Sequence, residues 1–527
     1  MATDSYNQHR GFRILIGLLI LIGVVGRILP LVNHQGRLLS QFPTEDGYLM
    51  LQIGRNMSLG HGMSVSAGTI ATNGTQPFCT FIWSLGYRLV DGDRVQGVAL
   101  VLIWQTLVAI ASAWLVVRIG RLVFADQDRS TMVSYVAAAC WFSSTVSIPH
   151  TMNCLESGTY VCAVLASVWL FLHYLVQFGS NWPIRSNLLL GVMLGWTFWV
   201  RNDAVFLVLA VCLTKLYVGR EKVTLAFYEA CQIGVTTIVI ALPWLYNNYT
   251  RFGGLMPISG HSQSYAAPFG YGAHLLPPVL VEYLSTFLPI PQRWMERSEI
   301  LWSTSIILAI AIWILIRTFR STHQKIIRAA IVLVAIYAAG LCGYYGTATA
   351  ARHFIGRYLF PLSPFASLFG FAVLFELFYV RIRPLSDKRF LFAASSLMVL
   401  TIIGLHARMY ILGRDHQHFP VVEWVKNNVE AESWVGAIQS GTLGYFHDRT
   451  YNLDGKVSPE ALQAKQLGRI PQYVIEKDIR HLVDWYGISE WIEVHPEIKE
   501  HFRIEIADRE RNLAALTRIT DSTPPKL

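Results

Sequence analysis

Two adjacent carboxylates, Glu45 and Asp46, lie a few residues beyond the first long hydrophobic segment of the chain, residues 14–32. Carboxylates can accept and release protons, and ionisable groups are costly to keep beside lipid, so acids at the end of a membrane span are functional candidates by default. The alternative interpretation is local, because acids in the first turn of a helix complement its dipole. Both interpretations are open at this point.

Three further ionisable residues stand at the ends of hydrophobic segments. Glu156 lies in the short polar segment 150–157, and Arg201 and Asp203 flank the polar break between segments 187–200 and 203–219. Glu156 can be a simple dipole complement at a helix start, and Arg201 and Asp203 can pair with each other. As ionisable groups at span ends, all three are also candidates for contact with a substrate.

A basic cluster, Arg352, His353 and Arg357, begins a later hydrophobic segment. Arginine binds phosphate through a planar fork of donors, so the cluster is a candidate phosphate clamp. Anchoring to lipid headgroups is the alternative. His261, in a polar loop, is a further candidate for substrate contact, although a histidine in such a loop needs no special role.

The composition places these residues in a membrane protein. The 527 residues are 53% hydrophobic and 15% charged, with a mean hydropathy of +0.39, whereas soluble domains are about one quarter charged. A transmembrane helix needs about 20 mostly apolar residues. The candidate segments are 14–32, 95–117, 131–149, 157–178, 187–200, 203–219, 229–249, 299–317, 326–346, 356–379 and 389–407. Segments 187–200 and 203–219 are short, and they are either two spans with a tight turn or one broken element.

The charge distribution predicts the topology. The net charge is +9, but the tail from Arg408 holds 15 basic and 18 acidic residues, so the basic excess belongs to the membrane region. With a cytoplasmic N-terminus, 17 Lys and Arg residues fall on the inner side, against 11 in all the rest of the membrane region, although the outer segments are much longer; the positive-inside rule favours this orientation. The polar pieces 33–94, 250–298 and 408–527 then all lie outside.

Local signals predict the elements that hold the first two acids. Thr44 can cap a helix that begins at Glu45, and apolar residues recur at helical spacing from Leu49 to Met57. We therefore expect an amphipathic helix that lies on the membrane surface and ends near Gly60 and Gly62.

The tail alternates helical and strand-like runs. We expect a helix over 421–429, a strand over 434–438, a turn over 441–444 and a strand over 450–453. Ser458 before Pro459 marks a helix start. About 120 residues suffice for a separate small α/β core. The chain contains no Gly-rich phosphate loop, no His-Glu-x-x-His, no Gly-x-Ser-x-Gly and no cysteine cluster, so nucleotide hydrolysis, zinc chemistry and serine hydrolysis have no local support.

Several short motifs are spread along the chain: Glu45-Asp46-Gly47-Tyr48, Arg55-Asn56, Gly60-His-Gly62, Thr72-Asn-Gly-Thr-Gln-Pro77, Leu155-Glu156, Trp199-Val-Arg-Asn-Asp203, Tyr249-Thr-Arg-Phe-Gly-Gly-Leu-Met-Pro-Ile-Ser259, Gln439-Ser-Gly-Thr-Leu-Gly-Tyr-Phe446 and Asn452-Leu-Asp-Gly455. Together they resemble the GT-C glycosyltransferases, most closely bacterial relatives of protein O-mannosyltransferases, aminoarabinose transferases and arabinofuranosyltransferases. In relatives a tryptophan often follows the Gln-Pro pair, where this chain has Phe78.

The resemblance implies an all-α polytopic membrane protein of about eleven transmembrane helices with a small α/β C-terminal extracytoplasmic domain. Residues 1–407 would form the transmembrane glycosyltransferase domain, with outer loops 33–94 and 250–298, and residues 408–527 the extracytoplasmic domain. No nucleic-acid partner is expected. The expected location is the bacterial inner membrane, with the N-terminus in the cytoplasm.

The resemblance also implies a mechanism. Such enzymes move a sugar from a polyprenyl-phosphate carrier to a glycan, lipid or protein acceptor, usually with inversion. By motif position Asp46 would be the general base, and Glu45 or Glu156 would position the acceptor. Arg352, His353 and Arg357 would neutralise the departing lipid phosphate, while Arg201, Asp203 and His261 would contact substrate. No cofactor is certain. If a divalent metal such as Mg or Mn is used, Asp46 and Glu156 are the candidate ligands.

Two other classes of function stay open from the sequence. A transporter or flippase of lipid-linked sugars tends to place charges near the bilayer midplane and to contain repeated halves. Here the acids stand at span ends, and no repeat is visible. A non-catalytic scaffold for envelope assembly, with the tail as its working part, is the third class.

Overall fold

The computed structural model describes residues 2–32, 36–66, 71–124, 130–265, 268–288, 301–322, 324–350, 352–375, 388–411 and 418–519. The chain forms two compact units. The helical unit comprises Met1–Arg37, Leu102–Trp244 and Ala266–Gly413, and the mixed unit comprises Leu38–Val101, Leu245–Tyr265 and Arg414–Leu527. The C-terminal tail thus shares a unit with segments that the sequence assigns to outer loops. The predicted division into domains 1–407 and 408–527 is not tested by these units and stays a prediction.

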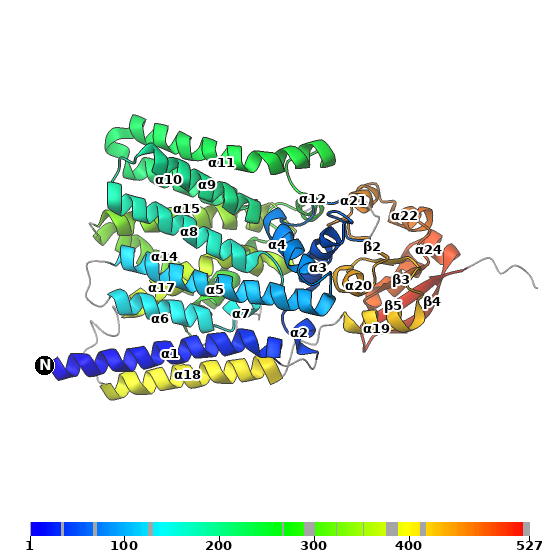
Figure 1. The fold of residues 1–527 in the computed structure, drawn as a ribbon, viewed down its shortest axis with the longest axis horizontal. Helices are drawn as coiled ribbons and strands as arrows, with labels where there is room; N and C mark the ends of the chain where they lie inside the picture. Colours follow the sequence, from blue (N-terminus) through cyan, green and yellow to red (C-terminus); the bar gives the residue numbers. More distant parts are fainter. Residues whose placement is uncertain are drawn as a thin grey trace, which may run out of the picture. The chain divides into compact units, whose positions relative to one another are not determined.

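Apolar helices form the helical unit (Figure 1). Within the described residues, eight helices are long and apolar enough to cross a membrane, and three apolar helices are shorter. They correspond one by one to the eleven expected segments, while the number of true spans stays a prediction. The main helices are α1 (Ala2–Val32), α5 (Arg94–Val123), α6 (Ser130–Ser143), α8 (Ser157–Phe178), α9 (Ile184–Val200), α10 (Ala204–Val218), α11 (Val223–Phe252), α14 (Leu301–Ser321), α15 (Lys325–Thr347), α17 (Ser363–Phe375) and α18 (Lys388–Ile411). Shorter pieces are α7 (Ser147–Thr151), η1 (Arg220–Lys222), η2 (Ala273–Leu275), α13 (Leu276–Glu282), η3 (Tyr283–Thr286), η6 (Arg352–Phe354), α16 (Ile355–Leu359) and η7 (Phe360–Leu362).

The polar break at Arg201-Asn202-Asp203 separates two helices, α9 and α10. Near the end of α10, the Lys215 ammonium donates to the carbonyl of Ser180, which precedes α9, at 3.1 Å. The end of α10 therefore returns to the start of α9, and the two helices run antiparallel. The sequence left two interpretations open for this region. The structure contains two helices joined by a tight turn.

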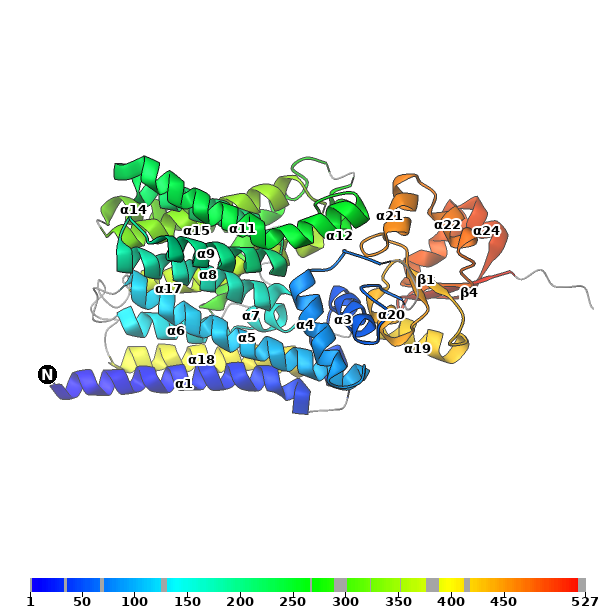
Figure 2. The ribbon, with the colours of Figure 1, turned by 45° about the horizontal axis from the view of Figure 1, so that its top comes forward.

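One apolar helix, α6, stops at Ser143, and two helices at the side of the unit satisfy its last carbonyls. Helices α1 and α18 lie side by side (Figures 1 and 2). From α1, the buried Arg27 donates to Phe142 O at 2.7 Å, and from α18, His406 Nε2 lies 2.7 Å from Ser143 O. Backbone groups exposed inside a membrane must find partners within the protein. Arg27 and His406 thus stabilise a helix end that apolar neighbours would leave unsatisfied.

The mixed unit holds a five-stranded sheet of order β2-β1-β3-β5-β4. Strand β1 pairs in parallel with β2 and β3, and the β3–β5 and β4–β5 pairs are antiparallel. The strands are β1 (Val435–Ala437), β2 (Thr450–Asn452), β3 (His481–Asp484), β4 (Phe502–Asp508) and β5 (Leu513–Arg518). The helices of this unit are α2 (Arg37–Ser40), α3 (Glu45–Ser58), α4 (Pro77–Arg88), α12 (Ile258–Ser264), α19 (Phe419–Asn428), α20 (Gly441–Phe446), α21 (Pro459–Gln466), α22 (Ile470–Glu476), η10 (Tyr486–Glu490), α23 (Trp491–Val494) and α24 (Pro496–His501). The predicted small α/β core is confirmed.

Side chains alternate across the sheet, so it has two buried faces. In β3, Leu482 packs with residues of α21, α22 and α24, whereas Val483 packs with residues of α19 and α20. The helix at Phe419, the strands at Val435 and Thr450 and the Ser458 cap agree with the expected elements. The expected turn over 441–444 is wrong, because these residues open helix α20, whose first amides are bound by a carboxylate from α3.

Helix α3 begins as predicted but does not lie on a surface. Thr44 Oγ1 accepts from the amide of Gly47 at 3.1 Å. The helix packs against α4 and α20, and its expected polar side is enclosed as well, since Gln52 and Asn56 are buried. The Asn56 amide donates to the carbonyls of Ser64 and Val65. Local hydrogen bonds thus satisfy the polar residues of a buried helix, and the surface-helix prediction is wrong.

Candidate active site

Three predicted site residues meet in the helical unit. The Arg201 guanidinium pairs with Glu156, and its Nη2 and Nε lie 2.6 and 2.9 Å from Asp203 Oδ2. Glu156 directly precedes α8, while Arg201 and Asp203 form the turn between α9 and α10. These three residues are termed the arginine cluster. The structure therefore joins Glu156 to the Arg201–Asp203 pair, which sequence spacing linked only to each other.

Tyrosines enclose the arginine cluster. Arg201 Nη2 donates to the Tyr345 hydroxyl at 3.2 Å, and the guanidinium lies 4.8 Å from the centre of the Tyr358 ring. The rings of Tyr345 and Tyr358 stack at 4.4 Å. The ring centre of Tyr160 lies 5.6 Å from the same guanidinium, and the hydroxyls of Tyr160 and Tyr337 lie 3.0 Å apart. Sequence reasoning missed all four tyrosines, because an aromatic residue in an apolar helix has the same local pattern whether it meets lipid or a buried cation.

The Arg201 guanidinium keeps its charge despite its burial. Only 4% of the surface of Arg201 is exposed, and this burial disfavours the charged guanidinium. Asp203, Tyr345 and Glu156 outweigh burial and raise the pKa of Arg201 above its ordinary value. Two carboxylates therefore share one permanent cation.

The structure describes two of the three side chains of the predicted phosphate clamp, those of His353 and Arg357. His353 is exposed in η6, and the side chain of Arg352 lies outside the described residues. The Arg357 guanidinium lies 4.8 Å from the ring centre of Phe354 and 5.1 Å from that of Tyr358. Because Tyr358 also contacts Arg201, the structure brings Arg357 to the tyrosines of the arginine cluster.

In the mixed unit, the Glu45 carboxylate is bound by helix α20. It accepts from the amides of Gly441 and Thr442, the latter at 2.9 Å, and from the Thr442 hydroxyl at 2.5 Å. Burial raises the pKa of Glu45, and the bonds from Thr442 and Gly441 oppose this in part. His418 lies 3.8 Å from Glu45 and is neutral, because burial lowers its pKa to about 3. Glu45 thus caps a helix 396 positions away.

Asp46 faces a lysine from the tail. Lys456 Nζ lies 3.7 Å from Asp46 Oδ1 and 3.3 Å from Asp454 Oδ2. Asp46, Asp454 and Lys456 are termed the lysine cluster. Their side chains are 17%, 11% and 18% exposed, so the cluster stays accessible from outside the unit. Sequence reasoning singled out the Asn452–Gly455 motif but missed Lys456, the next residue.

His261 is exposed on α12 and lies beside the loop that carries the lysine cluster. Its neighbour Ser262 donates to the carbonyl of Asp454 at 3.2 Å. Asn73 holds the start of α12, because its Oδ1 accepts from the amide of Ile258 at 3.1 Å. The structure thus places His261 on an element that packs beside the lysine cluster.

A metal site is not built from the candidate ligands. Across the described part of the chain, no group of three or more His, Cys, Asp and Glu side chains is placed to hold a metal ion. Asp46 is instead paired with Lys456, and Glu156 with Arg201. The residues present therefore do not fit a metal.

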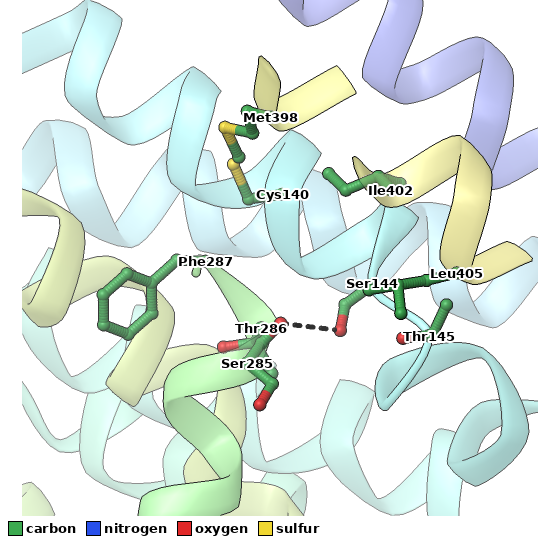
Figure 3. Close-up of a pocket in the computed structure, with 9 residues that line it drawn as sticks. All are labelled: Cys140, Ser144, Thr145, Ser285, Thr286, Phe287, Met398, Ile402 and Leu405. Carbon is green, nitrogen blue, oxygen red and sulfur yellow. Dashed lines mark hydrogen bonds between the residues drawn. The ribbon is translucent and has the colours of Figure 1, made fainter. Parts of the chain in front are cut away.

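A pocket in the helical unit lies between α6, η3 and α18 (Figure 3). Ser144 Oγ donates to the carbonyl of Ser285 across it at 3.3 Å. Its lining consists of Cys140, Ser144, Thr145, Ser285, Thr286, Phe287, Met398, Ile402 and Leu405. The lining contains no charged residue and none of the predicted site residues, so the pocket has no part in the proposed chemistry.

The chain adopts the fold of solved glycosyltransferase structures, and this is the fold that the sequence motifs led us to expect. With its long apolar helices, the chain is an integral membrane protein. Residues 408–516 match a domain of unknown function, DUF8728. No curated protein sequence matches the chain.

Two solved structures show the likeness in particular. ArnT from Cupriavidus metallidurans, bound to undecaprenyl phosphate, superposes with a TM-score of 0.60 at 12% identity, over 97% of this chain and 99% of that one. The archaeal oligosaccharyltransferase AglB from Archaeoglobus fulgidus, in complex with an inhibitory peptide and a dolichol-phosphate, superposes with a TM-score of 0.54 at 10% identity, over 98% of this chain and 75% of that one. At these identities the likeness concerns the fold alone.

Proposed function

We propose that this chain is an inverting glycosyltransferase that moves a sugar from a polyprenyl-phosphate carrier to an extracytoplasmic glycolipid, polysaccharide or protein acceptor. The observation that carries the proposal is the likeness of nearly the whole chain to two GT-C enzymes whose structures hold undecaprenyl phosphate and dolichol-phosphate. The charged clusters at the ends of apolar helices add support, because a lipid phosphate lies at that depth of a membrane.

Asp46 is the general base in this proposal. Its carboxylate removes the proton of the acceptor hydroxyl as the acceptor oxygen bonds to the anomeric carbon, and the bond from that carbon to the phosphate oxygen breaks. The polyprenyl phosphate leaves with the bonding electrons, and inversion follows from attack opposite the leaving group. The partial exposure of Asp46, 17% of its side chain, supports this role because a base must reach its substrate.

The other predicted residues take supporting roles. Arg352, His353 and Arg357 neutralise the charge that develops on the departing phosphate. Glu156 positions the acceptor and is held by Arg201, which pairs with Asp203 as well. Glu45 holds the start of α3, since its carboxylate is already bound by α20. His261 contacts substrate from α12.

The proposed location is the bacterial inner membrane, with the N-terminus in the cytoplasm and the C-terminal domain outside. The positive-inside bias supports this orientation. It exposes the mixed unit to the compartment where acceptors for envelope glycans are found.

The test is Asp46→Asn in a deletion strain, with lipid-linked and envelope glycans measured by mass spectrometry. We expect wild type to restore the missing glycan and Asp46→Asn to lower transfer by about 10²–10⁴-fold, the usual contribution of a general base. Asp478→Asn is the matched control, because Asp478 is an exposed acid at a positive φ of 49°, which asparagine tolerates.

Equal membrane levels of all three proteins are required for the comparison. Full restoration by Asp46→Asn would defeat the base assignment. If instead the deletion changes envelope assembly while wild type transfers no sugar in isolated membranes, the transporter or scaffold class replaces the enzyme.

A further inference from the structure

The sheet of the mixed unit has a topology that creates a ligand crevice. Strand β1 has β2 on one side and β3 on the other, and all three are parallel. The chain leaves β1 toward β2 and then crosses to β3, so the loops after β1 and β3 diverge. In open α/β sheets this point, at the carboxyl ends of the strands, is where ligands bind.

Here the chain itself fills the crevice. The loop after β1 leads into α20, whose first amides bind the Glu45 carboxylate. The fit is close, because a Cβ on Gly441 would lie 2.1 Å from the Glu45 carbonyl oxygen. The start of helix α3 therefore lies at the carboxyl ends of the strands, where other open α/β sheets bind a ligand.

The loop after β2 reaches Asp46, the residue that follows Glu45 in helix α3. Asn452 Oδ1 accepts from the amide of Gly455, and Asp454 Oδ1 accepts from the amide of Lys456 at 2.8 Å. Gly455 has a φ of 79°, so the loop turns sharply there. A Cβ on Gly74 would lie 2.2 Å from the Lys456 carbonyl, which shows that a second loop packs directly on this one. Lys456 is thus held from both sides.

We propose that Lys456 is a positioning residue for the base Asp46: the loop after β2 delivers its ammonium group to the Asp46 carboxylate, keeps that carboxylate charged and fixes its direction. The inference rests on the proposed role of Asp46. It also makes the C-terminal α/β domain part of the catalytic machinery, since the domain contributes a side chain to the base.

The charges around Asp46 favour this role. Glu45 precedes it in α3, and the two carboxylates repel each other, while Asp454 on the tail loop pairs with the same lysine. His418 beside Glu45 is neutral. Helix α20 has no charged residue, and α4 has Arg88 alone. Lys456 is the cation recorded within 4 Å of Asp46 in the described residues.

The test measures protonation of Asp46 directly, without any substrate. Infrared difference spectra of the purified full-length protein are recorded over a pH series, and the band lost in Asp46→Asn identifies the Asp46 carboxyl. We expect Lys456→Met to raise the midpoint of this band by ~1 pH unit, the lower end of the effect of a neighbouring charge. Lys456→Arg should restore the midpoint, and the exposed Lys499→Met should leave it unchanged. If Lys456→Met does not fold, Lys456→Gln replaces it.

An unchanged midpoint in Lys456→Met or Lys456→Gln would overturn the inference. In the deletion strain, Lys456→Met should lose transfer mainly on the acid side of the pH profile, and Lys456→Arg should recover it. Loss at all pH values alike, without rescue by arginine, would also overturn the inference and indicate a merely structural lysine. Full transfer by Asp46→Asn would instead defeat the proposed function, while the infrared midpoint still decides whether the pair exists.

Discussion

The arginine cluster and the lysine cluster each set two carboxylates against one cation, yet they differ in rigidity. In the arginine cluster the guanidinium is 5% exposed and binds both acids directly, with Asp203 at 2.6 Å. In the lysine cluster the ammonium is 18% exposed and stands 3.3 and 3.7 Å from its acids. The planar guanidinium of an arginine holds two partners in fixed geometry, whereas the ammonium group of a lysine is a point charge on a flexible side chain.

This difference indicates a division of labour. A tightly paired, buried carboxylate is a poor base, because its charge is already satisfied and its surroundings resist change. A loosely paired, accessible carboxylate can exchange its partner for a substrate proton. The difference is consistent with the proposed roles, in which the arginine cluster holds Glu156 in place and Asp46 of the lysine cluster accepts the proton.

The largest expected effect comes from removing each cation in turn. Arg201→Met leaves two buried acids without their partner and should lower the free energy of unfolding by about 3–5 kcal/mol. Lys456→Met should cost only about 1 kcal/mol, because the pair is looser and partly solvated. The measurement is denaturation of the detergent-solubilised full-length protein. Equal losses in the two variants would break the comparison.

A second expectation concerns Asp484, a buried carboxylate held by amides alone. It accepts from Ile438, Gln439 and Trp485, and burial raises its pKa from 3.8 to about 7. The folded state thus keeps a proton that the unfolded state releases, so this contribution to stability is complete below about pH 4 and is lost as pH rises through 7.

The corresponding loss is at most ~4 kcal/mol. It is measured as the fall in unfolding free energy from pH 4 to pH 8 relative to Asp484→Asn, which cannot titrate. A wild-type protein that becomes more stable than this variant as pH rises would contradict the assignment and would group Asp484 with the cation-paired acids.

The smallest expected effect tests how Glu45 is held. Thr442→Val removes the hydroxyl that donates to Glu45 but keeps the shape and the backbone amide. Because the acceptor is a carboxylate, the loss should be about 1.5–2 kcal/mol in the free energy of unfolding. Thr442→Ser retains the donor and serves as the control. If valine and serine behave alike, the amides of α20 suffice and the hydroxyl contributes nothing measurable.

Features with a local cause were predictable from the sequence. Apolar length located the eleven helices, Thr44 and Ser458 marked two helix starts, and alternating patterns indicated the strands at Val435 and Thr450. The Arg201–Asp203 pair was also foreseeable, because its members are two residues apart.

Features with a distant cause were not predictable. Helix α20 looked like a turn because its N-terminal partner, Glu45, lies 396 positions earlier. Helix α3 looked amphipathic because the sequence does not show that α4 and α20 enclose it. Lys456 carries no signal of its own, and Arg27 looked like one more basic residue until its bond to the end of α6 was known.

The separation between Glu45 and Gly441 has a consequence for biosynthesis. At about 5–20 residues per second, a ribosome needs roughly 20–80 s to synthesise the 396 positions between them. During that interval helix α3 has emerged without the partner that binds its first carboxylate. The surroundings of Asp46 are therefore completed only after Gly441 and Lys456 have been synthesised, and a nascent chain arrested before Gly441 would carry the membrane helices without the partners of the proposed base.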